Sequence, residues 1–220
     1  MRCPLFAIMK TRIDRVFHQL IQTDTIIYFL AINILTFLIL FAKKSLIENE
    51  TIAFQILQEE GRFGIYSIFN SLQFLAIPII YLYKSTIIGF ILWIGAFMFG
   101  YKITYKQCWK IALIGETVFL LPEIIKVFWF ILRPDDVNIW QIRAFYPLSI
   151  MNFFDYQTLP AQYHYPLKAL NVFEVIYWFV LVELVHSTAS KQRSYAVAIV
   201  FLSYVPLFWL WLVYYILVYK

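Results

Sequence analysis

Long apolar segments occupy most of this chain and constrain its fold more than any other feature. Segments long enough to cross a bilayer follow one another at 25–42, 63–101, 108–132, 167–186 and 194–219. A membrane-spanning helix needs about 20 mostly apolar residues. Hydrophobic residues make up 62 % of the sequence, whereas soluble domains contain about 45–50 %. The sequence therefore predicts an all-α fold, a polytopic transmembrane helical bundle in contact with the lipid bilayer.

The segment 63–101 leaves the number of spans open. Two helices that turn at Lys84-Ser85 would give six spans, whereas one span from about Ala76, preceded by an interfacial helix, gives five. Cytoplasmic loops are rich in Lys and Arg. Five spans put two short basic loops without nearby acids on the same side as the basic N-terminus, and six spans remove this bias. Five spans are preferred, with the N-terminus inside and the C-terminus outside. The loop residues are Lys102, Lys106, Lys110, Lys191 and Arg193.

Two polar segments and a basic arm complete the predicted organisation. Residues 1–24 form a basic arm in which apolar and basic residues recur at helical spacing, which suits a helix on an anionic membrane surface. Residues 25–220 form a single transmembrane domain. It contains an acidic loop at 45–62 and a long outer loop at 133–166. No signal peptide is predicted, because no small-residue cleavage site follows the first apolar segment.

A set of ionisable residues falls inside the predicted spans. A charge at the bilayer centre costs at least about 2.5–3.5 kcal/mol, so such residues usually pair or line a cavity. Depth along the helices, at about 1.5 Å per residue, places opposite charges at similar levels. We therefore predict a Lys84–Glu123 pair and a Lys126–Glu174 pair. The complete set is Lys84, Glu116, Glu123, Lys126, Glu174, Glu183 and His186.

This charged set has more than one interpretation. Its members either fix which helix packs on which, or form a polar path for protons or a small substrate. Glu183 and His186 make a Glu-x-x-His pair, but metal sites in helical bundles use two such pairs with further carboxylates. No metal site, cofactor or catalytic residue is expected, because the sequence has no nucleophile, zinc-protease or phosphate-loop motif. The chain is predicted not to be an enzyme.

A ten-residue motif occurs twice, at 146–155 and 165–174. Both copies read Tyr-Pro-Leu, three residues, Asn, one residue, Phe, and a carboxylate. Because proline suits the first turn of a helix, each copy is predicted to begin a helix at the outer membrane interface. The helices should pack on each other or on one neighbour, with at least one Asn bonding a backbone group across the pair. The motif residues are Tyr146, Pro147, Leu148, Asn152, Phe154, Tyr165, Pro166, Leu167, Asn171 and Phe173.

Several stretches between about 63 and 219 resemble the Yip domain family of integral membrane proteins. Asn171-Val172-Phe173-Glu174 leads into Tyr177-Trp178, a short loop with Ser190-Lys191 and a final span, as at the end of that family. Ile103-Thr104-Tyr105-Lys106-Gln107, followed by a span with Glu116 and Pro122, resembles its middle. The stretch Phe145-Tyr146-Pro147-Leu148-Ser149 and the second Tyr-Pro-Leu resemble a bacterial, Bacteroidetes-type branch.

The resemblance implies a non-enzymatic protein that acts through partners. Family members have five spans and a cytosolic N-terminus, which agrees with the charge pattern. Their eukaryotic relatives bind small Rab-type GTPases, a role that is not carried over to a bacterium. The basic arm and the acidic segment 45–60 have no counterpart in the family.

The function hypothesis is an accessory or scaffold subunit of a larger assembly in the bacterial inner membrane. Its expected partners are lipid and other membrane protein subunits, without nucleic acid. The alternative hypothesis is a small transporter or channel that uses the buried Glu, Lys and His residues.

Overall fold

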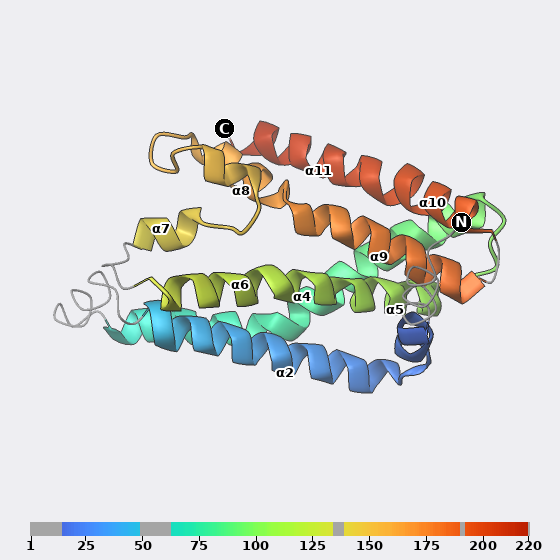
Figure 1. Cartoon of the computed structure of the whole chain (residues 1–220), viewed down its shortest axis with the longest axis horizontal. Coiled ribbons are helices and arrows are strands. Elements are labelled where there is room, and N and C mark those ends of the chain that lie inside the picture. Colours follow the sequence, from blue (N-terminus) through green and yellow to red (C-terminus); the bar gives the residue numbers. More distant parts are fainter. Residues whose placement is uncertain (1–14, 49–62, 134–138, 190–191, 220) are drawn as a thin grey trace, which may run out of the picture. The chain divides into compact units, whose positions relative to one another are not determined.

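The computed structural model describes residues 15–48, 63–133, 139–189 and 192–219, and these form helices joined by short connections (Figure 1). The all-α prediction is confirmed for these residues. Extended pairing among them is limited to one isolated bridge between Ser149 and Asn171. The first fourteen residues of the basic arm and most of the acidic loop lie outside the described residues.

Within the described residues, four helical segments are long and apolar enough to cross a membrane. The first contains α2 (Thr25–Lys43) and the second lies within α4 (Phe63–Met98). The third is α9 (Val172–Ala189), and the fourth joins α10 (Arg193–Ile199) and α11 (Val205–Val218) through a π-helical turn, Val200–Tyr204. By length and composition the chain is therefore a multi-pass membrane protein. The candidate spans are Thr25–Leu46, Leu72–Met98, Val172–Ala189 and Arg193–Val218.

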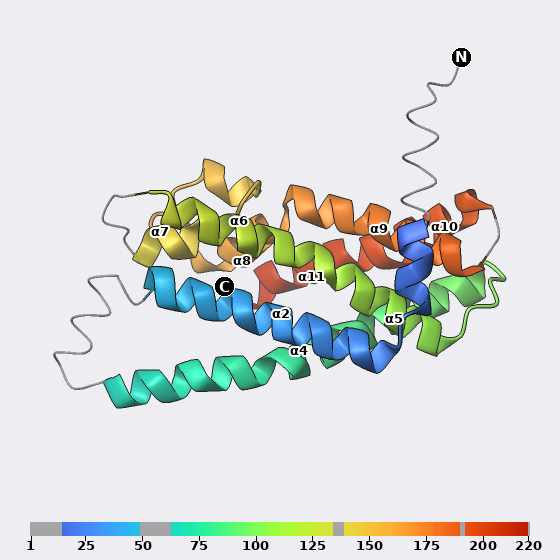
Figure 2. The same ribbon diagram turned by 60° about the horizontal axis from the view of Figure 1, so that its bottom comes forward.

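Helix α4 bears on the choice between five and six spans. It runs without interruption from Phe63 to Met98 (Figure 2). Lys84 and Ser85 are both inside this range. The turn that six spans require at these residues is therefore absent. The expected separate interfacial helix before Ala76 is also replaced by the first turns of α4.

The remaining predicted span, 108–132, is helical but carries charges. Helix α5 (Tyr105–Gly115), a 3-10 turn (Glu116–Phe119) and α6 (Leu120–Ile131) follow one another directly. Thr104 begins α5 with a capping box, in which its side chain and that of Gln107 satisfy each other's backbone N–H groups. The segment is thus helical and has a defined start at Thr104, although it is less apolar than the four candidate spans.

The chain forms two compact units, which are described separately. Unit 1 comprises Met1–Leu30, Leu82–Glu116 and Ile176–Leu210, and unit 2 comprises Ala31–Tyr81, Thr117–Val175 and Trp211–Lys220. The prediction of a single domain remains a prediction.

Glycines bring helices close together in unit 1. A Cβ atom added to Gly89 of α4 would lie 2.8 Å from the Trp109 Cα atom of α5. A Cβ atom on Gly115 would lie 2.7 Å from the ring of Tyr177, which is fully buried in α9. Small residues at such contacts let helix backbones approach closely, which is typical of packing in membranes.

In unit 2 the segment predicted as a long outer loop folds into short helices. These are α7 (Ile139–Ala144), a 3-10 turn (Ile150–Phe153) and α8 (Ala161–Ala169). Phe145, just after α7, packs on the α6 rings of Trp129 and Phe130, with ring centroids 5.4 and 5.5 Å away. Aromatic packing therefore attaches this segment to α6.

The described part of the basic arm also belongs to unit 1. Residues 15–22 are helical, and Asp24 caps the start of α2 by accepting a 2.7 Å hydrogen bond from the Ile26 N–H. Lys110 of α5 donates to the carbonyls of Ile21 and Thr23. These bonds fix the end of the arm to α5.

Candidate functional site

The repeated motif does not begin two helices as predicted. In the first copy Pro147 and Leu148 form a turn, and Leu148 has a positive φ of 54° that is incompatible with an α-helix. In the second copy Pro166 lies inside α8, whose N-cap position is taken by another proline, Pro160. The prediction is wrong because proline tolerates a turn, a cap and a short helix as well as the first helical position.

The two copies nevertheless contact each other through their backbones. The Ile150 N–H donates to the Leu170 carbonyl at 3.0 Å, and the Val172 N–H donates to the Leu148 carbonyl at 3.2 Å. These bonds flank the bridge between Ser149 and Asn171. The second copy therefore anchors the first next to the start of α9.

Each repeated asparagine stabilises its own copy. The Asn152 amide donates to the Tyr146 carbonyl at 2.8 Å. The Asn171 Oδ1 atom accepts from the Glu174 N–H at 2.9 Å, which caps the start of α9, while its amide donates to the carbonyls of Lys168 and Ala169. The expected asparagine bond across the pair is replaced by these local bonds.

The structure gives Lys84 and Glu123 partners that the sequence did not predict, and the predicted pair between them, whose residues belong to different units, remains a prediction. Lys84 pairs with Glu116 at the end of α5, and Glu123 of α6 lies 3.4 Å from the Lys43 Nζ atom of α2. Depth along one helix does not show how far the facing helix is displaced against it, and an offset of about one turn, 5.4 Å, is enough to change a partner.

The other members of the predicted charged set lie in separate places. Lys126 is buried and donates to the Ile142 carbonyl, and Glu174 is buried in the first turn of α9. Their predicted pair remains a prediction. Glu183 pairs with Arg193, and His186 is partly buried in the last turn of α9. Among the described residues no group of three or more His, Cys, Asp or Glu is placed to hold a metal ion.

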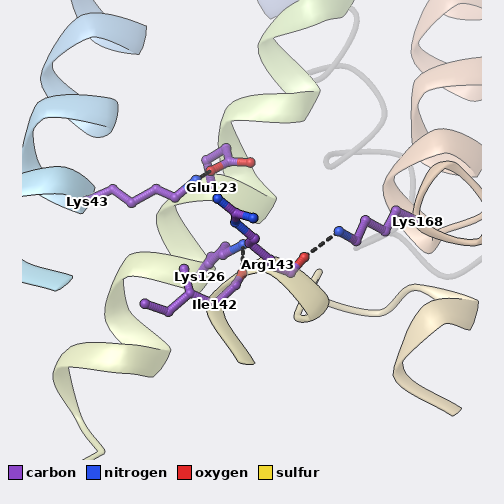
Figure 3. Close-up of polar contacts among 6 residues, drawn as sticks. All are labelled: Lys43, Glu123, Lys126, Ile142, Arg143 and Lys168. Carbon is purple, nitrogen blue, oxygen red and sulfur yellow. Dashed lines mark hydrogen bonds and ion pairs between the residues drawn. The ribbon is translucent and has the colours of Figure 1, made fainter. Parts of the chain in front are cut away.

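Unit 2 contains a group of cations that converge on the end of α7. We call Lys43, Lys126, Arg143 and Lys168 the cation cluster (Figure 3). Lys126 donates to the Ile142 carbonyl, and Lys168 donates to the next carbonyl, that of Arg143. The last carbonyls of a helix have no intrahelical partner and form the negative end of its dipole. Two lysines from different helices therefore bind the C-terminal end of α7.

Aromatic rings and mutual repulsion characterise the rest of the cation cluster. The Arg143 guanidinium lies 5.7 Å from the centre of the Trp140 ring, and the Lys168 ammonium lies 4.7 Å from that of Tyr156. Burial lowers the pKa of Lys168 from its ordinary value, and the charges of Lys43 and Arg143 lower it further. Lys43 and Arg143 are thus close enough to Lys168 to disfavour its charged form.

Sequence reasoning found only one member of the cation cluster, Lys126. The predicted first span at 25–42 ends just before Lys43, and Arg143 falls in the predicted outer loop at 133–166. The position of Lys168 inside the second repeat was the available signal, since the repeat is where the chain folds back on itself.

Comparison of this chain with protein-family models, with curated proteins and with solved structures gives no match. The resemblance to the Yip domain family therefore remains a prediction, and the functional argument depends on the geometry described above.

Proposed function

We propose that the chain is a non-enzymatic integral membrane protein that acts as an accessory or scaffold subunit of a larger membrane assembly. One observation carries the proposal, namely that charges inside the helices are held in ion pairs between separate helical segments. Lys84 of α4 pairs with Glu116, and Lys43 of α2 pairs with Glu123 of α6. Paired charges of this kind specify which helices pack together, which is a structural role.

The proposal includes five membrane crossings in the bacterial inner membrane, with a cytoplasmic N-terminus. The α5–α6 segment would be the fifth crossing. Its charges make it less apolar than the four candidate spans, but Glu116 and Glu123 each have a basic partner. Cysteine substitution tests this topology. A thiol reagent should label Gln157→Cys from outside intact cells and Thr104→Cys only after lysis. The reverse pattern would contradict the proposed orientation.

Helix α2 offers a surface for a partner. Only 6 % of its span is buried by the rest of the chain, compared with 39 % for the span of α9. The exposed side chains are large and apolar, including Ile34 and Leu38. Such a surface suits contact with lipid or with a helix of another subunit.

Purification in a mild detergent tests the scaffold role. The tagged full-length protein should carry a stoichiometric partner in native mass spectrometry. Leu38→Trp enlarges the exposed face of α2 and should release that partner. Leu210→Trp, at an exposed position of α11, is the matched control and should retain it. A protein that runs alone under every mild condition would count against the proposal.

A transporter is the second candidate function, supported by polar atoms in unit 1. The Ser85 hydroxyl, the second carboxylate oxygen of Glu116 and the His186 Nδ1 atom are buried without a hydrogen-bond partner. Such atoms suit a transient proton or solute. Proton flux into liposomes that is lost in Glu116→Gln, but retained in Glu183→Gln, would favour this function over the scaffold role.

A further inference from the structure

We propose that the cation cluster of unit 2 binds a phosphate group, carried by a membrane lipid or by a soluble ligand. This site is independent of the scaffold role, since it concerns a ligand and not a protein partner. The charge balance, the available donors and the position of the cluster along the chain support it.

The cation cluster contains more positive than negative charge. One carboxylate lies beside its four cations, that of the partly buried Glu123, which is 3.4 Å from Lys43. Glu174, buried in the first turn of α9, is a second carboxylate in the described part of unit 2. Even with both carboxylates ionised, the arithmetic of four positive and two negative charges leaves an excess of two. A phosphate group, with one or two negative charges, would neutralise this excess.

The donors of the cation cluster suit phosphate oxygens. An ammonium group has three N–H donors and a guanidinium has five. Lys168 uses one donor on the Arg143 carbonyl, while the exposed Arg143 side chain places its guanidinium beside the Trp140 ring. Planar guanidinium groups bind phosphate through two parallel hydrogen bonds. Arg143 would therefore provide the directional contact and Lys168 the nearby point charge.

The position of the cation cluster favours a lipid as the source of the phosphate. Lys43 lies near the end of the span Thr25–Leu46, and Lys168 precedes the span Val172–Ala189 by four residues. Both ends of these spans lie where lipid headgroups begin. Trp140 and Tyr156, which contact the cations, are of the type enriched at this level of a membrane.

Capping of α7 is the alternative explanation for part of the cluster. It accounts for Lys126 and Lys168, which bind the carbonyls of Ile142 and Arg143. It does not account for the side chain of Arg143, which contributes a further cation beside them. Arg143 is therefore the residue that separates ligand binding from helix capping.

Binding of phosphatidic acid to the full-length protein in detergent micelles tests the proposal. Diacylglycerol with the same acyl chains lacks the phosphate and is the reference lipid. Arg143→Gln should weaken phosphatidic acid binding about tenfold, because hydrogen bonds to charged groups contribute about 1.5–3 kcal/mol. Arg133→Gln is the matched control and should change binding less than about twofold, since Arg133 also lies over a tryptophan, Trp129, but outside the cluster.

A second arm identifies the source of the phosphate. Inorganic phosphate or pyrophosphate that competes with phosphatidic acid indicates a soluble ligand, and failure to compete indicates a lipid headgroup. Lys168→Arg should retain binding, whereas Lys168→Gln should lose it, which distinguishes a charged contact from loss of folding. Equal binding of phosphatidic acid and diacylglycerol, or equal losses in Arg143→Gln and Arg133→Gln, would overturn the proposal.

Discussion

The two compact units place their charged side chains in different settings. In unit 1 Lys84 pairs with Glu116, and Arg193 pairs with Glu183, so cations in helices meet carboxylates of the same unit. In unit 2 Lys126 and Lys168 bind backbone carbonyls of α7. Unit 2 has a similar pair, Lys43 with Glu123, but its cation cluster also contains cations that bind carbonyls and not carboxylates.

The units also differ in how their helices pack. In unit 1 Gly89, Gly95 and Gly115 all occupy positions where a Cβ atom would come within 3.0 Å of a neighbour. In unit 2, within the described residues, cations pack on aromatic rings instead, as in Lys44 on Phe74 and Arg133 on Trp129. Close backbone contact favours a rigid bundle, while cations on rings favour a polar and aromatic surface.

These differences indicate separate roles for the two units. Ion pairs inside its helices and close helix contacts give unit 1 what a structural framework in lipid requires. The local group of cations in the cation cluster attracts an anion to one place in unit 2. The predictions below test this contrast in order of expected effect.

Loss of Lys84 should give the largest effect, because its partner is deeply buried. The Glu116 side chain is 3 % exposed and that of Lys84 is 41 % exposed. Lys84→Met leaves a buried carboxylate without this partner. It should lower the free energy of unfolding by about 3 kcal/mol, at the lower end of the range for broken buried pairs. The melting temperature in detergent should fall by on the order of 10 °C. Glu116→Leu should cost less, because a half-exposed ammonium can move toward polar surroundings.

The double variant supplies the control for this pair. Lys84→Met combined with Glu116→Leu removes both charges and should recover part of the stability lost in Lys84→Met alone. Strict additivity of the two single losses would show that the pair does not couple α4 to the end of α5, and the contrast between the units would lose its basis.

Gly89→Ala should give the next largest effect. Its Cβ atom would meet the Trp109 Cα atom at 2.8 Å, and a backbone atom cannot move aside. We expect destabilisation of about 1–3 kcal/mol by overpacking, measured as a lower melting temperature. Phe97→Ala, which removes an exposed ring from the same helix, is the control and should cost less. Equal losses would argue against a rigid α4–α5 contact.

The sequence predicted the helical fold and five spans, and four candidate spans are found among the described residues, because these features follow from local properties. An apolar run of about 20 residues can satisfy its backbone in lipid only as a helix or as part of a closed barrel. The uninterrupted apolar run around Lys84 likewise allowed a single helix, which α4 is.

The partners of the charges did not follow from the sequence, because they depend on how far helices slide and rotate against each other. Glu116 and Glu123 are seven residues apart on one helical segment, so they lie about 10 Å apart along it and on the same face. Either one suits a lysine on a neighbouring helix. The cation cluster was missed for a similar reason, since Arg143 and Lys168 meet only after the polar segment folds onto α6.

Asn171→Ala should have a smaller effect than the two changes in unit 1. Asn171 caps α9 through the Glu174 N–H at 2.9 Å, and loss of such a cap costs about 1 kcal/mol. Asn152 is the equivalent residue of the first repeat and is exposed, with a bond to the Tyr146 carbonyl. Asn152→Ala should therefore cost less than Asn171→Ala in thermal unfolding. The opposite order would indicate that the first copy, and not the start of α9, anchors the paired segments.

The pH dependence caused by Lys168 should be the smallest effect, because its side chain is only partly buried and solvent screens it. Burial, Lys43 and Arg143 lower its pKa below the ordinary value of 10.5. Between the folded pKa and 10.5 the unfolded chain binds more protons than the folded chain, so stability should rise with pH in this window. Lys168→Met should remove this rise, whereas Lys106→Met, at an exposed position of α5, should retain it. Unfolding midpoints measured from neutral pH upward provide the comparison.

Phosphatidic acid should also suppress the rise in the unaltered protein, because a bound phosphate favours the charged form of Lys168 and returns its pKa toward the ordinary value. A rise that persists at saturating phosphatidic acid would place the lipid away from Lys168, and the cation cluster would then need another counterion.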